Sequence, residues 1–140
     1  MNRHETGRIG EKSAVLYLEE HGYTVIGTNV RVGHDEIDII AENDEYTVFA
    51  EVKTRRQYPD TVTEFGTPAS AVDEKKQANI IRAAERYLED NPTEKTPRID
   101  IIEIYTDPDS LRYKVLDIRH LENAVQKRGK FSRNPRKSTR

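Results

Sequence analysis

The sequence feature that most constrains the fold is a pair of alternating segments joined by a short polar turn. Residues 36–42 read EIDIIAE and residues 46–54 read YTVFAEVKT, with Asn43 and Asp44 between them. Because successive side chains of a strand point to opposite faces of a sheet, each segment predicts a β-strand with one apolar face. That apolar layer comprises Ile37, Ile39, Ala41, Val48, Ala50 and Val52. We therefore predict a β-hairpin that covers a hydrophobic core.

The opposite face of this predicted hairpin gathers charged side chains at one end. These side chains are Glu36, Asp38, Glu51 and Lys53. A two-residue turn places Glu36 opposite Glu51, whereas a four-residue loop places Asp38 opposite Glu51. A three-residue loop would put Glu51 in the apolar layer, which is unfavourable. The first two registers stay open, and both bring the charged side chains together.

Carboxylates that face one another on adjacent strands destabilise a sheet, and a divalent cation removes that penalty. Mg²⁺ prefers carboxylates, carbonyls and water, and Mn²⁺ is expected to substitute for it. Asp38 and Glu51 are therefore candidate metal ligands, with Glu36 and the Val52 carbonyl as further ones. Lys53 could hold or deprotonate an attacking water, or stabilise charge on a phosphate. The alternative is an exposed charged face on which Lys53 only neutralises its neighbours.

Hydrophobic periodicity and turn residues predict the remaining elements. We expect helices over 5–21, 71–89 and 119–126, and strands over 23–29, 36–42, 46–54, 98–105 and 111–118. A long loop is expected over 55–70, where two prolines and a glycine occur. The order α-β-β-β-α-β-β-α predicts a single α/β domain over residues 1–125.

The end of the chain differs in charge from the rest. Residues 126–140 hold seven Lys or Arg and no Asp or Glu, although the net charge of the chain is −2. This segment is either a basic tail that binds a polyanion or a disordered, solubilising end. Lys75 and Lys76 similarly predict either a nucleic-acid path or a solvated helix face. The candidate nucleic-acid contacts are Arg55, Arg56, Lys75, Lys76, Lys127, Arg128 and Lys130.

Composition excludes several other classes of protein. The chain has no cysteine, which excludes disulfides, thiolate zinc sites and cysteine nucleophiles. No apolar run approaches the ~20 residues that span a membrane. The first residues lack the apolar stretch of a signal peptide, so we expect a cytoplasmic protein without a membrane partner. A glycine-rich phosphate loop is also absent, which argues against nucleotide hydrolysis by that route.

The charged hairpin is similar to a known signature. Asp38, followed by Glu51-Val52-Lys53, resembles the D…(D/E)xK motif of the PD-(D/E)XK nucleases. Over residues 5–122 the chain resembles the YraN family, bacterial relatives of archaeal Holliday-junction resolvases. The likeness rests on Gly7 to Glu11, Gly22-Tyr23, Asn29, Arg31, Glu36 to Asp38, Phe49 to Arg55, Phe65-Gly66, Lys75 and Arg98 to Asp100.

This resemblance implies a restriction-endonuclease-like core, in which helices flank a mixed five-stranded sheet. It implies metal binding by Asp38 and Glu51, catalysis by Lys53, and a helix-borne carboxylate, Glu11, near the site. It also implies a Mg²⁺-dependent endonuclease-like phosphodiesterase that acts on DNA, including branched DNA, in preference to RNA. Because branched junctions are two-fold, the resemblance further implies a homodimer.

Glycine positions in this chain add two expectations. The family usually has Gly directly before Glu-Ile-Asp, whereas this chain has Asp35 there and Gly33 two residues earlier. The turn with positive φ is therefore displaced, or Asp35 itself forms it. Gly7 and Gly10 would each cost ~1 kcal/mol in a helix interior. They predict a close approach of the helix to the sheet or to a phosphate, and the alternative is fraying of the helix near its N-terminus.

Other functions fit the same residues. A non-catalytic nucleic-acid-binding module of the same fold would use the basic tail for affinity and show strong salt dependence. A protein-interaction subunit with a vestigial site would bind no divalent metal at Asp38 and Glu51. His34 is either polar surface or a functional group, and Arg98 and Asp100 form either a structural pair or a support for the site.

Overall fold

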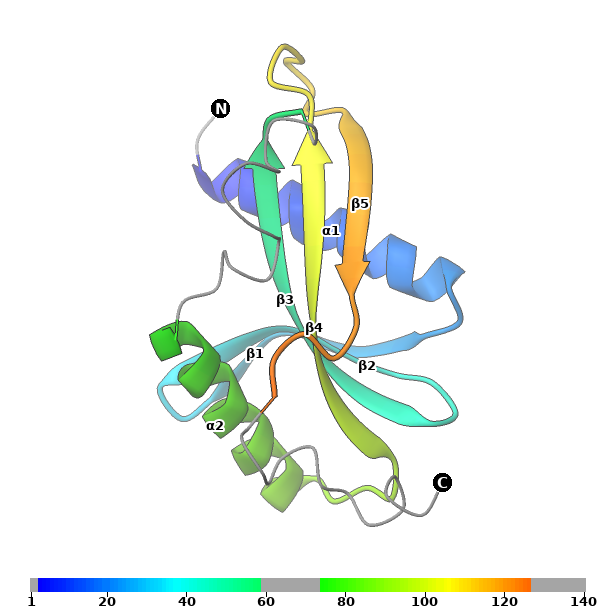
Figure 1. The fold of residues 1–140 in the computed structure, drawn as a ribbon, viewed down its shortest axis with the longest axis vertical. Helices are drawn as coiled ribbons and strands as arrows, with labels where there is room; N and C mark the ends of the chain where they lie inside the picture. Colours follow the sequence, from blue (N-terminus) through cyan, green and yellow to red (C-terminus); the bar gives the residue numbers. More distant parts are fainter. Residues whose placement is uncertain (1–2, 59–73, 127–140) are drawn as a thin grey trace.

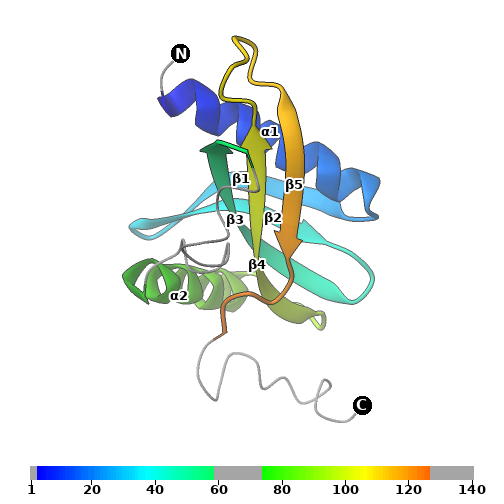
Figure 2. The ribbon, with the colours of Figure 1, turned by 45° about the horizontal axis from the view of Figure 1, so that its top comes forward.

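The computed structural model of the chain describes residues 3–58 and 74–126. Its elements are α1 (Arg3–Glu20), β1 (Thr24–Val32), β2 (Asp35–Glu42), β3 (Tyr46–Arg56), α2 (Glu74–Asp90), β4 (Thr96–Thr106) and β5 (Val115–Leu121). The strands form one five-stranded sheet in chain order, with β3 and β4 parallel and the other neighbours antiparallel. The predicted α/β domain with a mixed sheet is confirmed, and the two helices lie on opposite faces of it (Figures 1 and 2).

Two hydrophobic clusters fix one helix to each face of the sheet. The cluster beneath α1 comprises Ala14, Leu18, Tyr23, Ile39, Ala41, Val48, Ala50, Ile102 and Ile104. The cluster beneath α2 comprises Val32, Ile37, Ile40, Phe49, Ile80, Ala83, Ala84, Ile99, Ile101 and Val125. Side chains alternate along a strand, so residues in phase with Ile40 and Phe49 face α2. Asp38 and Glu51 therefore lie on the α2 face.

The predicted apolar layer of the hairpin is confirmed except at Ile37. Ile39, Ala41, Val48 and Ala50 lie in the cluster beneath α1, and Val52 packs against it. Ile37 lies instead in the cluster beneath α2. β2 pairs with β3 only as far as Ile39, and the β1–β2 hairpin then turns across the other strands (Figure 1). Alternation counted from β3 does not predict the side that Ile37 takes beyond this point.

The β2–β3 connection has the register of a four-residue loop. Glu42 pairs with Thr47, so the alternative with a two-residue turn is wrong. The Asn43 side-chain carbonyl oxygen (Oδ1) accepts hydrogen bonds from the backbone N–H groups of Glu45 (2.9 Å) and Tyr46 (2.7 Å). This Asx turn stabilises the longer loop locally. The register that places Asp38 opposite Glu51 is therefore the one observed.

The β1–β2 connection is a two-residue turn. Val32 pairs with Asp35, which leaves Gly33 and His34 as the turn, and Gly33 has a φ of 64°. Glycine adopts this left-handed conformation without steric cost, and glycine is therefore favoured at the first position of such a two-residue turn. Of the two alternatives, the turn is displaced to Gly33. Asp35 begins β2 instead.

The predicted helix over 119–126 is wrong. β5 continues through His120 and Leu121, which pair with Ile102 and Ile101 of β4. The chain then turns at Asn123, and the N–H of Ala124 donates to the Ile99 carbonyl at 2.8 Å. These sheet contacts outweigh a weak helical pattern. β5 also begins at Val115 rather than at 111, because turns occupy the preceding residues.

Gly10 brings α1 close to β3. A Cβ at Gly10 would overlap the Thr54 hydroxyl, whereas one at Gly7 would meet nothing within 4 Å. The expected close approach of helix and sheet is therefore confirmed at Gly10, and Gly7 lacks such a contact. This contact fixes α1 against β3 at the residue before Glu11.

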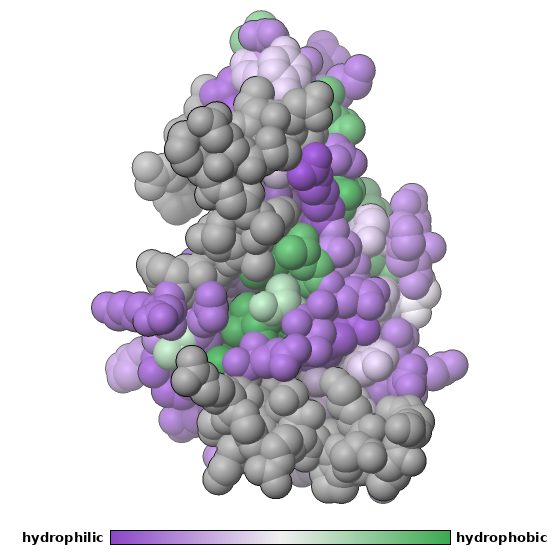
Figure 3. All heavy atoms as spheres, in the orientation of Figure 1, coloured by the Kyte–Doolittle hydropathy of each residue, from purple (hydrophilic) through white to green (hydrophobic). Residues whose placement is uncertain are grey.

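The face that bears α2 is largely polar. In Figure 3, which has the orientation of Figure 1, hydrophilic side chains cover much of its described surface, with a hydrophobic strip near the centre. Most of the expected loop over 55–70 and the first residues of the predicted second helix lie outside the described residues.

Candidate functional site

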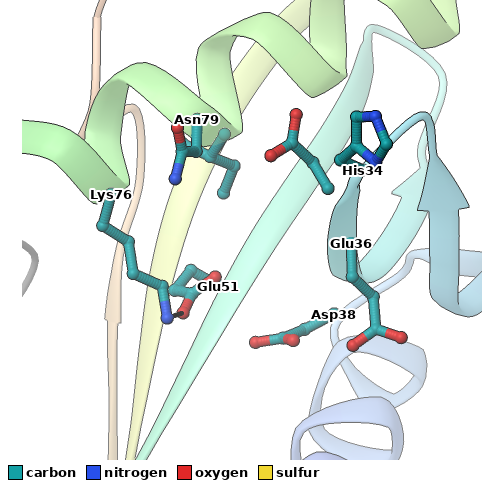
Figure 4. A pocket seen from close by; sticks show the side chains of 8 residues that line it. His34, Glu36, Asp38, Glu51, Lys76 and Asn79 are labelled. Carbon is teal, nitrogen blue, oxygen red and sulfur yellow. Dashed lines mark ion pairs between the residues drawn. The ribbon is translucent and has the colours of Figure 1, made fainter.

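A cavity of about 270 Å³ opens between the N-terminal half of α2 and the charged end of the β2–β3 hairpin. The side chains around it come from the β1–β2 turn, β2, β3 and α2 (Figure 4). They are His34, Asp35, Glu36, Asp38, Glu51, Lys76, Asn79 and Ile80. Most of the described side chains that line this cavity are therefore ionisable.

Asp38 and Glu51 meet where the two strands of the hairpin separate. The last paired residues are Ile39 and Ala50, and one further step of this register brings Asp38 opposite Glu51. The Val52 N–H donates to Oδ2 of Asp38 at 2.8 Å. The carboxylate thus takes the place of a backbone acceptor that the departing strand no longer supplies, which fixes its position at the cavity.

Lys76 reaches this pair of carboxylates from α2. Its ammonium nitrogen lies 3.0 Å from Oε2 of Glu51, whose side chain is only 8% exposed. Figure 4 shows Lys76 and Glu51 on one side of the cavity, with Asp38 and Glu36 on the other. Asn79 lies one helical turn after Lys76 and faces the same cavity. The cavity therefore contains a cation as well as carboxylates.

The electrostatic environment disfavours ionisation of Asp38. Burial, together with the negative charges of Glu51 and Glu11, raises the pKa of its carboxyl group to about 7. The Val52 N–H and the Lys76 ammonium lower this pKa, but they do not offset the burial. A further cation bound at this position would favour the ionised form.

Glu11 approaches the site from the side of α1. Its carboxylate accepts a hydrogen bond from the Asn29 side chain at 3.0 Å, and its charge raises the pKa of Asp38. Asn29 adopts a φ of 49°, which is uncommon for a residue other than glycine. Glu11 lines a different cavity, between α1 and β1. The helix-borne carboxylate therefore acts on Asp38 through charge rather than by lining the same cavity.

Glu36 and Lys53, the other residues predicted to take part in the reaction, lie in different surroundings. Glu36 is exposed and lines the cavity. Lys53 is half-buried, does not line the cavity, and forms no ion pair within the described part of the chain. In the parallel β3–β4 pair it lies beside Glu103. Of the two lysines, Lys53 and Lys76, it is therefore Lys76 of α2 that contacts a carboxylate of the cavity.

The residues predicted to contact nucleic acid fall into three groups. Arg55 and Arg56 make internal contacts, Arg55 to Glu103 at 2.6 Å and Arg56 to the Pro108 carbonyl at 2.9 Å. Lys75 is exposed on α2, and Lys76 lies in the cavity. The tail residues Lys127, Arg128 and Lys130 lie outside the described residues.

A second polar cluster lies on the α1 face of the sheet. Two guanidinium nitrogens of Arg98 donate to the two oxygens of Asp100, at 2.9 and 2.8 Å. His120 Nε2 lies 2.6 Å from Asp100, and the Asn123 N–H donates to it at 2.9 Å. Arg98 also donates to the Tyr23 hydroxyl at 2.6 Å. The structural pair expected for Arg98 and Asp100 is thus confirmed.

The sequence did not lead us to expect that α2 would supply polar side chains to this cavity. Lys76 was grouped with the nucleic-acid contacts, and Asn79 was not singled out. A usable signal was present, because residues three apart share a helix face, so Lys76 predicts Asn79 beside it. His34 lines the cavity, but its sequence context offered no signal beyond proximity to Glu36.

Comparison with known proteins identifies the family. A model of the uncharacterised protein family UPF0102 matches residues 10–104. The chain belongs to this family. UPF0102 is the YraN-like family of the PD-(D/E)XK nuclease-like superfamily, so the family predicted from the sequence is confirmed.

Several UPF0102 proteins cover most of this chain. One from Dehalococcoides mccartyi is 41% identical over 104 residues, which are 74% of this chain and 82% of that protein. One from Caldanaerobacter subterraneus subsp. tengcongensis is 38% identical over 125 residues, 89% of this chain and 97% of that protein. One from Bacteroides thetaiotaomicron is 38% identical over 120 residues, 86% and 91% of the two chains.

The donor chemistry of this UPF0102 site fits a magnesium ion. No group of three or more His, Asp or Glu side chains in residues 3–58 and 74–126 has the arrangement of a metal cluster. Mg²⁺ is commonly held by only one or two carboxylates, with water and substrate phosphates as the other ligands. Asp38 and Glu51 supply such a pair, and Glu36 is a third carboxylate at the same cavity.

Within the part that the structure describes, neither helix has the length and apolar character needed to cross a bilayer.

Proposed function

We propose that this protein is a metal-dependent phosphodiesterase that cleaves nucleic acid, with DNA, including branched DNA, as the expected substrate. The observation that carries the proposal is the convergence of Asp38 and Glu51 on one cavity that also holds the Lys76 ammonium. Acidic and basic groups at one polar cavity suit the binding of a metal and a phosphate together. Membership of UPF0102 supports the proposal through the superfamily, although a shared fold does not determine activity.

The chain's own residues take the following roles in this proposal. Asp38 and Glu51 hold Mg²⁺, and Glu36 and the Val52 carbonyl are further candidate ligands. The metal, when bound, supplies a Lewis acid that lowers the pKa of a bound water. Lys76 binds a non-bridging phosphate oxygen from the α2 side, and Lys53 positions the attacking water or stabilises developing charge.

A calorimetric titration tests the metal site directly. Mn²⁺ is titrated into the wild type and Asp38→Ala at near-physiological salt, with Asp44→Ala as the matched control. Asp44 is an exposed aspartate of the β2–β3 loop, outside the cavity. We expect binding by the wild type and Asp44→Ala and none by Asp38→Ala. Equal binding by all three proteins would reject the site.

A cleavage assay then tests the activity. Branched, flapped and single-stranded DNA are incubated with Mg²⁺ and with the wild type, Asp38→Ala or Lys53→Ala. We expect cleavage by the wild type and its loss in both variants, with the fold intact by circular dichroism. Cleavage that persists in both variants would reject these residues as the active site.

A nucleic-acid-binding module without turnover is the second candidate. It is favoured by the Lys76–Glu51 ion pair, which already neutralises one of the two proposed ligands. On this hypothesis the basic segment 126–140 supplies the affinity, and its removal abolishes DNA binding. On the phosphodiesterase hypothesis its removal weakens substrate capture and leaves Mn²⁺ binding unchanged.

A cytoplasmic homodimer completes the proposal. Two copies would match the two-fold symmetry of a branched junction. Sedimentation equilibrium of the full chain, alone and with a junction, measures this state. A monomer under both conditions would restrict the proposal to single-site cleavage.

A further inference from the structure

A second cavity, of about 260 Å³, adjoins the carboxylate cavity at the tip of the β1–β2 hairpin. Arg82 and Arg86 of α2 form one wall, and the turn residues Gly33 and His34 form the other. His34 and Asp35 line both cavities. In Figure 1 the turn between β1 and β2 lies beside α2, so one helix flanks both cavities in succession.

The two adjoining cavities differ in the sign of their charge. Four carboxylates, one lysine and one histidine line the first, whereas two arginines, one aspartate and the same histidine line the second. The first cavity therefore suits a cation and the second an anion. The two opposite environments are separated only by the shared residues His34 and Asp35.

Arg82 is held in a fixed orientation. Its Nε and Nη2 donate to the two oxygens of Asp35, at 3.1 and 3.0 Å, and Nη2 also donates to Asn79 at 2.9 Å. A guanidinium group has five N–H donors in a rigid plane. Within the described chain nothing accepts from Nη1 of Arg82, so this edge keeps its donors for a ligand at the cavity.

Arg86 follows one helical turn after Arg82 and is exposed. Within residues 3–58 and 74–126 no carboxylate or other acceptor pairs with its guanidinium. Its Nη1 lies 3.7 Å from the position that a Cβ on Gly33 would take. Because Gly33 has no side chain, the guanidinium stays next to open space at the turn. Two guanidinium groups one turn apart, one fixed and one unpaired, suit the oxygens of a phosphate.

We propose that the cavity formed by His34, Arg82 and Arg86 binds a backbone phosphate of the nucleic-acid strand that enters the carboxylate cavity. This inference rests on the proposed function and names a substrate-binding subsite for it. From Asp38 back to Asp35 the strand rises ~10 Å. The subsite thus positions a phosphate near the reacting one and reads no base sequence.

Anisotropy titrations of a short fluorescent DNA duplex in EDTA test the subsite without cleavage. The proteins are the full-length wild type, Arg86→Ala and Arg112→Ala. Arg112 is a matched control, because it is an exposed arginine in the β4–β5 connection, away from both cavities. Arg86→Ala is expected to weaken binding about tenfold and to reduce the salt slope by about one. Arg112→Ala is expected to match the wild type.

The outcomes separate this inference from the proposed function. If Arg86→Ala and Arg112→Ala bind the duplex with equal affinity and equal salt slope, the subsite is rejected, whatever the cleavage assay shows. If Arg86→Ala binds more weakly but retains wild-type Mn²⁺ binding, the subsite is supported. This support holds even where no cleavage is detected, in which case only the phosphodiesterase proposal fails. A wild type that does not bind the duplex at low salt also overturns the subsite.

Discussion

Asp38 and Asp100 are both enclosed by the fold, but on opposite faces of the sheet, and their pKa values shift in opposite directions. Burial raises the pKa of Asp38 to about 7. Burial also acts to raise the pKa of Asp100, but hydrogen bonds from His120, Arg98 and the Asn123 N–H outweigh it and lower the pKa. The protein thus compensates the charge of Asp100 internally. The charge of Asp38 is compensated only in part, by the Val52 N–H and by Lys76.

The largest expected effect is a loss of stability on substitution of Asp100, whose charge is compensated inside the protein. Asp100 is fully buried, and Asp100→Ala leaves Arg98 and the Asn123 N–H without their acceptor. Breaking a buried ion pair from one side typically costs 3–5 kcal/mol, so we expect a loss of about that size. Urea unfolding measures it, and Asp44→Ala at an exposed loop position serves as the control. A loss below about 1 kcal/mol would show that the network is not structural.

A smaller effect of opposite sign is expected at Asp38. Because its folded pKa lies near 7 and its unfolded value near 3.8, the unfolded chain ionises first as the pH rises. Stability is therefore lost between about pH 4 and 7 on account of this group, and the loss is complete above pH 7. Asp38→Asn, which retains an acceptor for the Val52 N–H, should be more stable than wild type by at least about 1 kcal/mol at pH 8.

Unfolding curves at pH 4 and pH 8 check this prediction. The stability difference between Asp38→Asn and the wild type should be small at pH 4 and large at pH 8. Saturating Mg²⁺ should reduce it at pH 8, because a ligand that binds only the folded wild type stabilises it. A difference that does not vary with pH would show that Asp38 is compensated as fully as Asp100.

The smallest effect is expected at Lys76, whose positive charge already offsets part of the negative charge of the site. Lys76→Met removes a positive charge beside the metal ligands, so it should raise Mn²⁺ affinity by about threefold, the size of a partly exposed ion pair. It should also weaken DNA binding. Lys75→Met is the matched control, because Lys75 is the neighbouring lysine and does not line the cavity. Calorimetry that gives the two variants equal Mn²⁺ affinity would remove Lys76 from the site.

The sequence predicted those features of the site that depend on the alternation of side chains within the β2–β3 hairpin. Asp38 and Glu51 share a face because strand side chains alternate, and the three-residue loop was excluded because it would place Glu51 in the apolar layer. The choice between the remaining registers depended on the Asx turn of Asn43, which apolar patterning does not reveal. The side of Ile37 depended on where β2 leaves β3, which is a tertiary property.

Contacts that come from distant parts of the chain were harder to predict. A strand was predicted over 111–118, but the end of β5 was assigned to a helix over 119–126, because its pairing with β4, at Leu121 and Ile101, has no local signature. Lys76 could be placed on a helix, but its position against Glu51 depends on how α2 crosses the sheet. The Arg98–Asp100 pair was predictable, since the two residues lie two apart on one strand face.

The parallel pairing of β3 with β4 has a consequence for the order in which the molecule folds. Parallel neighbours need a long crossover, and here that crossover contains α2, which carries Lys76. The hairpin that brings Asp38 and Glu51 together closes a short loop, whereas the crossover closes a long one at greater entropic cost. The two carboxylates are therefore expected to meet early during folding, before their lysine arrives. A divalent ion present at that stage would meet its ligands without a competing cation and could accelerate refolding.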